Sequence, residues 1–252
     1  MNDDTREFTL GNVFRENDPS TLYRIRDGKV LFRHYPLRGA DIETFRFYAG
    51  GFAKDRKHCY CYNSRLAGAN PATFRALNFT YATDGQSVWT MGGQIKEAHA
   101  PSFVVCDDGD YDLGHGRRVP YGFGKDKDRV FYFNFDGKAN WVRKASPASF
   151  VSLNDGHFGR DDQFIFFDTA ILPKANVAHW QKLGGFYSRD DARIYYGNRI
   201  IRDADHATFE VVPTGRDWLQ MAKDKNRYYR NDGVMSAAEF ANDLTEYGGP
   251  VK

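Results

Sequence analysis

Cysteine is scarce in this sequence, and long apolar runs are missing. The 252 residues include three cysteines, Cys59, Cys61 and Cys106, too few for a disulfide scaffold, so a reducing, cytoplasmic location is expected. No run approaches the roughly 18 apolar residues that a membrane helix needs, and no membrane partner is expected. The N-terminal segment Met1–Phe8 carries acidic residues where a secretion signal carries a basic region, so Sec-type export is not expected.

Neither sign of charge dominates the composition. Lys plus Arg number 35 and Asp plus Glu number 33, so no whole-chain field favours nucleic acid, and no nucleic-acid partner is expected. Aromatic residues make up 16% of the chain, which favours β-strands. The length allows one large domain or two small ones, and it is sufficient for a core without disulfides.

The motifs of common catalytic sites are also missing. Gly122–Gly124 and Gly184–Gly185 lack the Lys-Ser/Thr tail and the strand-to-helix setting of a phosphate-binding loop. Ser64, Ser102 and Ser149 lack nucleophile-elbow glycines, and there is no His-Glu-x-x-His sequence. The sequence therefore predicts a protein that is not an enzyme and that needs no cofactor.

A short segment recurs seven times along the chain. In each copy except the one with His99, a helix-capping type of residue, usually after an alanine, is followed four positions later by an aromatic residue, as in Ala204-Asp205 with Phe209. The aromatics are Phe45, Phe74, Phe103, Phe150, Trp180, Phe209 and Phe240. Asp, Asn and Ser accept hydrogen bonds from the free N–H groups of a helical turn, so each copy is predicted to be one turn whose aromatic points into the core.

A second motif, predicted to be a β-hairpin, alternates with these turns. It has an aspartate, two or three polar residues, and then a β-branched or aromatic run that ends near glycine, as in Asp190 to Gly197. The aspartates are Asp55, Asp84, Asp126, Asp161, Asp190 and Asp224. Aspartate fixes a turn by bonding to backbone two residues on. Because the residue recurs at every equivalent turn, its predicted role is structural rather than catalytic.

Together the two motifs predict an all-β fold of about seven three-stranded repeats, each with a helical turn. Units of about 29–35 residues are too short for independent cores, so neighbours must stack. Both an open curved array and a propeller-like ring satisfy this requirement; the shortness of the units favours the array. The prediction is a single repeat domain over residues 1–252, with units near 12–45, 46–74, 75–103, 121–150, 151–180, 181–209 and 216–244 and an insertion at 104–120.

The segment Asp224-Lys-Asn-Arg-Tyr-Tyr229 resembles the signature of the DKNYY family, bacterial proteins built of short repeats. Ala69–Phe74 and Ala204–Phe209 are similar to the segment that follows this signature in the family. The resemblance covers about residues 12–244, apart from 104–122 and much of the first unit. It implies the repeat architecture and no particular activity.

The insertion is the one clear departure from the repeat pattern, so function is expected there. Its carboxylates alternate as in a calcium loop, but Leu113 stands where that loop has glycine and Val119 where it has glutamate. Cys106 with His115 lacks further ligands at zinc spacing. No metal site is predicted. The predicted partner-binding residues are Asp107, Asp108, Asp110, Tyr111, Asp112 and His115.

Repeat surfaces suit protein recognition, and an acidic loop suits a cationic cleft. The first hypothesis is therefore a non-enzymatic protein-binding module, specifically a bacterial immunity protein that binds and neutralises a cognate toxin or effector. The alternative is a carbohydrate- or small-ligand-binding protein that uses exposed aromatics, with Trp89, Trp141, Trp180 and Trp218 as reporters. A glycoside hydrolase is the third hypothesis, and it requires two carboxylates roughly 5–10 Å apart in a pocket.

Overall fold

The computed structural model describes residues 3–16, 18–113, 117–214 and 219–247. These residues form two compact units, Met1–Gly159 and Arg160–Lys252, which we call the N-terminal and C-terminal units and describe separately. The prediction of one repeat domain stays a prediction. The all-β repeat fold is confirmed, because the described residues form many small antiparallel sheets and a single α-helix.

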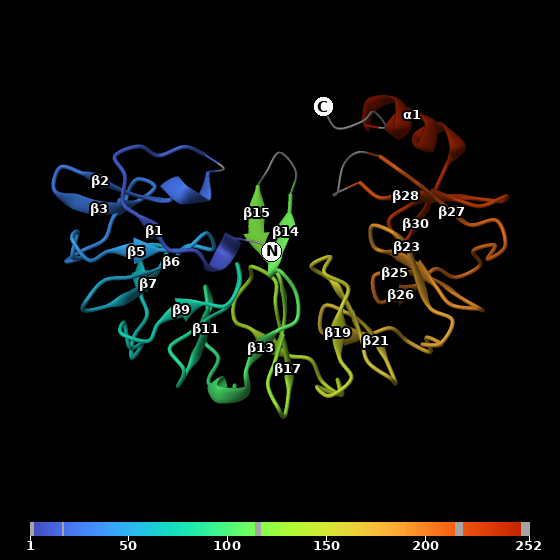
Figure 1. The fold of residues 1–252 in the computed structure, drawn as a ribbon. Coiled ribbons are helices and arrows are strands. Elements are labelled where there is room, and N and C mark those ends of the chain that lie inside the picture. Colours follow the sequence, from blue (N-terminus) through green and yellow to red (C-terminus); the bar gives the residue numbers. More distant parts are fainter. Residues whose placement is uncertain (1–2, 17, 114–116, 215–218, 248–252) are drawn as a thin grey trace. The chain divides into compact units, whose positions relative to one another are not determined.

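The N-terminal unit contains a series of small sheets (Figure 1). The first sheet contains β2 (Tyr23–Arg26), β3 (Lys29–Phe32) and β4 (Tyr35–Pro36). The second contains β1 (Phe8–Thr9), β5 (Arg46–Phe47), β6 (Phe52–Lys54), β7 (Cys59–Cys61) and β8 (Ser64–Arg65). The third contains β9 (Arg75–Ala76), β10 (Ala82–Thr83), β11 (Val88–Thr90) and β12 (Gly93–Gln94). The next contains β13 (Val104–Val105), β16 (Gly122–Lys125), β17 (Val130–Phe133) and β18 (Asn140–Trp141). A separate hairpin contains β14 (Asp110–Asp112) and β15 (Arg118–Pro120), and β19 (Val151–Ser152) follows, with β20 (Phe158–Arg160) reaching the unit boundary. Three short 3-10 helices complete it: η1 (Asp3–Thr5), η2 (Pro19–Thr21) and η3 (Ala100–Ser102).

The C-terminal unit continues the pattern. It contains the pair β21 (Ile165–Phe167) and β22 (Ala170–Ile171); the sheet of β23 (Gln181–Gly184), β24 (Tyr187–Arg189), β25 (Ile194–Tyr196) and β26 (Arg199–Ile200); the sheet of β27 (Glu210–Val212), β28 (Met221–Lys223), β29 (Tyr228–Arg230) and β30 (Gly233–Met235); and helix α1 (Ala237–Tyr247).

Most repeats have four strands rather than the three expected. The extra strand follows the helical turn and pairs with the next hairpin, as β13 pairs with β16 and β27 with β28. The sequence predicts a strand at this place, such as Phe209–Val212, which leads into the next unit, but it does not predict which strand this one pairs with. Each repeat therefore supplies an edge strand to its successor, and this pairing joins neighbouring sequence units.

The predicted helical turns are present as single turns, with one exception. His179 N, for example, donates to Asn176 O at 3.1 Å, and Thr208 N donates to Asp205 O at 3.2 Å. The last copy was predicted to be a single turn, but it begins the 11-residue helix α1. Ser236 and Glu239 form a capping box at its start, in which Glu239 N donates to Ser236 Oγ at 3.2 Å and Ser236 N donates to Glu239 Oε2 at 2.9 Å.

The seven predicted aromatics are all buried in the core. Phe209 lies between Tyr187 and Tyr229, with ring centroids at 5.6 and 5.4 Å. Tyr187 is buried too, and its hydroxyl donates to Gln220 O at 3.2 Å and to Asn231 O at 2.7 Å in the following repeat. The core around Tyr187 and Phe209 is thus completed by the following repeat, as expected for units too short to fold alone.

Candidate functional site

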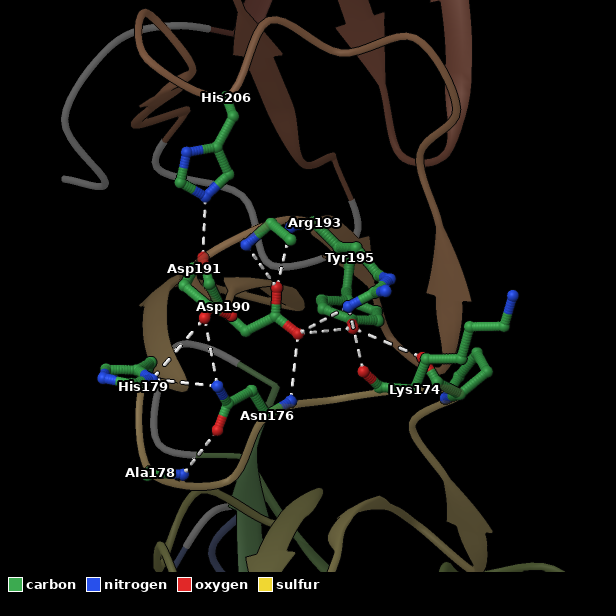
Figure 2. A network of polar contacts seen from close by, with 11 residues as sticks. Lys174, Asn176, Ala178, His179, Asp190, Asp191, Arg193, Tyr195 and His206 are labelled. Atoms are coloured by element: carbon green, nitrogen blue, oxygen red, sulfur yellow. Dashed lines mark hydrogen bonds and ion pairs between the residues drawn. The ribbon is translucent and has the colours of Figure 1, made fainter.

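The repeated aspartates form one structural device, which we call the aspartate staple. Figure 2 shows one copy, with Asp190 at its centre. The Asp190 Oδ1 atom accepts hydrogen bonds from the backbone N–H groups of Ala192 and Arg193, at 2.9 and 2.7 Å. Its Oδ2 atom accepts from Asn176 N and from the Tyr195 hydroxyl, both at 3.0 Å. One carboxylate therefore fixes the hairpin turn, holds the preceding helical turn and pairs with a buried tyrosine.

The two turn bonds recur at the other five aspartates, and a tyrosine hydroxyl also donates to Asp55 and Asp224. Asp224 accepts from the N–H groups of Asn226 and Arg227 at 2.7 and 2.8 Å, from Asp205 N at 2.8 Å and from the Tyr229 hydroxyl at 2.6 Å. The six staple aspartates are all buried. Burial by itself would raise the pKa of Asp190, but these hydrogen bonds outweigh it and hold the pKa below its ordinary value. An ionised carboxylate whose oxygens accept hydrogen bonds from backbone N–H groups has a structural role.

The insertion lies between β13 and β16, the two strands that other repeats join by a short loop. Residues 110–112 and 118–120 form the antiparallel pair β14–β15, which extends away from the neighbouring sheets (Figure 1). Its base is held from two sides. Asn78 Nδ2 donates to Asp107 O at 3.0 Å, and Asn154 Nδ2 donates to Asp108 Oδ2 at 2.9 Å. The insertion is thus a braced hairpin, fixed by the repeats before and after it.

Arg118 anchors the hairpin to the N-terminal segment. Its Nε donates to Asp110 Oδ2 at 2.5 Å, and its two terminal nitrogens donate to the Asp4 carboxylate at 2.8 and 2.7 Å. Its guanidinium carbon also lies 4.4 Å from the ring centroid of Phe79. Burial acts to lower the pKa of Arg118, but the bonds to Asp110 and Asp4 raise it above its ordinary value. Asp110 is therefore engaged within the protein.

The other predicted contact residues have different settings. Asp108 and Asp112 are exposed, and Tyr111 is half-buried with its ring 5.0 Å from that of His157. Asp112 lies opposite Arg118 in the β14–β15 pair. His115 lies outside the described residues. The structure brings the described members together on one hairpin and its base, while their role in partner binding stays a prediction.

Asp107 differs from its neighbours because its carboxylate points into the base of the insertion. Oδ1 accepts from Gly109 N at 3.0 Å, and Oδ2 accepts from Phe123 N at 2.8 Å and Ser152 Oγ at 2.9 Å. Burial raises the pKa of Asp107 to about 7, although the three hydrogen bonds act in the opposite direction. The residue therefore titrates near neutral pH and links the insertion to β16 and β19.

This titration predicts a pH-dependent stability. The unfolded pKa is near 3.9, so between about pH 4 and pH 7 the folded protein retains a proton that the unfolded chain has lost, and stability falls as pH rises. Relative to Asp107→Asn, the wild type should lose on the order of 2 kcal/mol of unfolding free energy between pH 5 and pH 7. Urea unfolding at both pH values measures this. Asp108→Asn, at the exposed neighbouring residue, should show the same change of unfolding free energy with pH as the wild type. Equal slopes for wild type and Asp107→Asn would contradict the prediction.

A cavity of about 390 Å³ lies beside the insertion, entirely within the N-terminal unit. Its lining combines aromatic and aliphatic side chains with charged groups: Phe14, Asp18, Pro19, Leu22, Phe32, Arg33, Ala49, Gly50, Tyr62, Phe79, Met91, Arg117, Arg118, Val119, Pro120 and Phe135. The insertion supplies one wall, and loops of four repeats supply the rest. Sequence reasoning missed this cavity because its residues are spread over more than a hundred positions; the only local signal was the insertion itself.

The thiols and indoles do not gather at this site. Cys59 and Cys61 are buried in β7, and burial raises the pKa of Cys59 to about 12. Within the described ranges no three His, Cys, Asp or Glu side chains are grouped as metal ligands. Trp89 and Trp180 are buried, Trp141 is half exposed, and Trp218 lies outside the described residues. Among the described residues, no helix has the length and apolar character needed to cross a membrane.

The sheets, the shared cores and the aspartate staple define an all-β protein of short stacked repeats with one elaborated loop. The family model of the DKNYY family matches residues 23–233, so the chain belongs to the DKNYY family. Comparisons with curated proteins and with solved structures gave no match. In this chain the signature residues Asp224 and Tyr229 are the two ends of a staple.

Proposed function

We propose that the protein is a non-enzymatic protein-binding module that uses the insertion as its contact surface. The observation that supports this proposal most is the single braced hairpin in an otherwise regular series of repeats. Its base is held by Asn78 and Asn154, so it can meet a partner with little loss of conformational freedom. The specific form we propose is an immunity protein in the bacterial cytoplasm that neutralises a toxin or effector.

The carboxylates favour a basic partner surface. Asp108 and Asp112 are exposed on the insertion, and Asp108 Oδ2 also accepts from Asn154 Nδ2 at 2.9 Å. Asp110 and Asp107 accept hydrogen bonds from Arg118 and from Phe123 N, respectively. Exposed carboxylates on a fixed hairpin steer a cationic partner and set the register of the complex. Tyr111, half-buried between them, adds the aromatic contact common in binding surfaces.

A hydrolase is less well supported. The single carboxylate that lines the cavity belongs to Asp18, and its Oδ1 accepts from Ser20 N at 3.0 Å as the cap of η2. Glycoside hydrolysis needs a pair of carboxylates around the scissile bond. The staple aspartates are buried and bonded to backbone, so they are poor candidates for that pair.

The test is binding to the product of a neighbouring gene of the toxin type, or to a partner captured from the native cell. Asp108→Ala combined with Asp112→Ala should weaken binding at least tenfold, about 1.4 kcal/mol, and should reduce its salt dependence. The control variant combines Asp27→Ala with Asp128→Ala, which remove two exposed carboxylates outside the insertion. This variant should bind the partner with the wild-type affinity. Isothermal titration at two salt concentrations measures the affinity of each variant and its salt dependence. Equal affinity for the insertion double variant and wild type would refute the proposed surface.

A further inference from the structure

The cavity in the N-terminal unit has features of a small-molecule site that are independent of the proposed protein contact. Its buried lining residues include Phe32, Ala49, Phe79 and Val119. Small-molecule sites have volumes of roughly 300–1,000 Å³, mostly apolar linings and a few placed polar groups. A cavity of 390 Å³ holds about 13 non-hydrogen atoms if each occupies the roughly 30 Å³ of a liquid water molecule.

The charged residues that line the cavity differ in whether they already have partners within the protein. Arg118 is bound by Asp4 and Asp110. Arg33 and Arg117, which we call the cationic rim, are exposed and line the cavity. Neither forms an ion pair with another residue in the described part of the chain. The carboxylate of Asp18 is occupied by Ser20 N and Ser20 Oγ, at 3.0 and 2.5 Å.

The two arginines of the rim favour an anion in the cavity, because both line it and both are exposed. The Arg33 guanidinium carbon lies 5.6 Å from the ring centroid of Phe32, so an aromatic face and a cation lie next to each other. Arg117 directly precedes β15, and the three residues of β15 also line the cavity. Guanidinium groups bind carboxylates through paired hydrogen bonds. A carboxylate carried by an apolar body in the cavity would therefore have two unpaired guanidinium groups available in the lining.

We propose that this cavity binds a small molecule with an apolar body of about ten carbon atoms and one terminal carboxylate. Burial of the body supplies most of the affinity, and the cationic rim selects the anion over neutral or cationic molecules of the same shape. Because the insertion forms one wall, the site exists only when residues 117–120 are folded against the repeats.

The experiment is isothermal titration of the full chain with decanoate and with decylammonium, which have alkyl chains of similar length, about nine and ten carbon atoms, and opposite charges. Decanoate should bind with a dissociation constant in the micromolar range, and decylammonium at least tenfold more weakly. Arg33→Gln with Arg117→Gln should reduce decanoate affinity at least tenfold and remove the preference for the anion. Arg26→Gln, at an exposed arginine that does not line the cavity, is the matched control and should bind as wild type.

A second variant separates the cavity from simple surface attraction. Met91→Trp narrows the cavity without altering its charge, so it should weaken the binding of both ligands. The midpoint of its urea unfolding reports whether the variant is folded. Absence of decanoate binding by folded wild type would overturn the proposal, as would equal binding of the two ligands or binding that the rim variants leave unchanged. The proposed protein contact uses Asp108 and Asp112, so the two tests can fail independently.

Discussion

Replacing Asp190 with alanine is expected to lower the free energy of unfolding of the C-terminal unit by about 3–5 kcal/mol. The substitution leaves three partly buried backbone N–H groups without their acceptor, and the buried Tyr195 hydroxyl loses its bond to Asp190 and keeps only Pro173 O. It also frees the helical turn at Asn176 from the hairpin. Urea unfolding followed by circular dichroism, with hydrogen exchange on the amides of β24 and β25, measures the loss.

Asp191→Ala is the matched control, because it removes a carboxylate one position along the chain. Asp191 is half exposed and accepts from Asn176 Nδ2 at 3.1 Å, so its loss should cost less than about 1 kcal/mol. Similar effects for the two variants would show that the staple is not the source of stability. Because the pKa of Asp190 is lowered by folding, its contribution is present above the unfolded pKa near 3.9 and is lost as pH falls through the folded value.

A double variant at Tyr195 and Asp190 tests whether the two side chains of the staple contribute to stability together or independently. Tyr195→Phe removes one hydroxyl that donates to Asp190 Oδ2 at 3.0 Å and to Pro173 O at 3.3 Å. Combined with Asp190→Ala, it should add less than its separate cost, since the bond to the carboxylate is already absent. Full additivity would mean that the two side chains stabilise the repeat independently.

Gly50→Ala is the second large effect expected, about 2–3 kcal/mol of destabilisation in the N-terminal unit. A Cβ on Gly50 would overlap the backbone carbonyl of Phe79 in the next repeat, and backbone cannot move aside as a flexible side chain can. Gly50 and Phe79 also line the cavity. The variant should therefore weaken decanoate binding as well as lower the unfolding midpoint in urea.

Gly11→Ala is the control for this substitution, since a Cβ there meets no atom within 4 Å. It should change the unfolding free energy by less than about 1 kcal/mol. If Gly50→Ala were as stable as Gly11→Ala, the close approach of the two loops would not contribute to the packing of neighbouring repeats.

The repeat itself could be predicted from the sequence because its causes are local. Asp190 bonds to N–H groups two and three residues on, and Phe209 lies one helical turn beyond its cap. Spacing alone reveals such contacts. The capping sequence at Ser236 was also visible, but the length of α1 was not, because the copies before it end after one turn.

Other features were set by contacts between distant segments. The strand β13 pairs with β16 across the whole insertion, and Arg118 meets Asp4 across 114 positions. The pKa of Asp107, raised by burial to about 7, depends on Phe123 and Ser152, which no spacing rule connects to it.

The sequence by itself determined that the chain forms repeats, which residues close each turn, and that one insertion interrupts the series. Only the tertiary structure decided that the insertion is a braced hairpin, that several of its acidic residues are bonded internally, and that a cavity with two exposed arginines lies beside it. The physical reason is that turn and cap bonds form between near neighbours, whereas burial and cavity walls depend on which distant surfaces pack together.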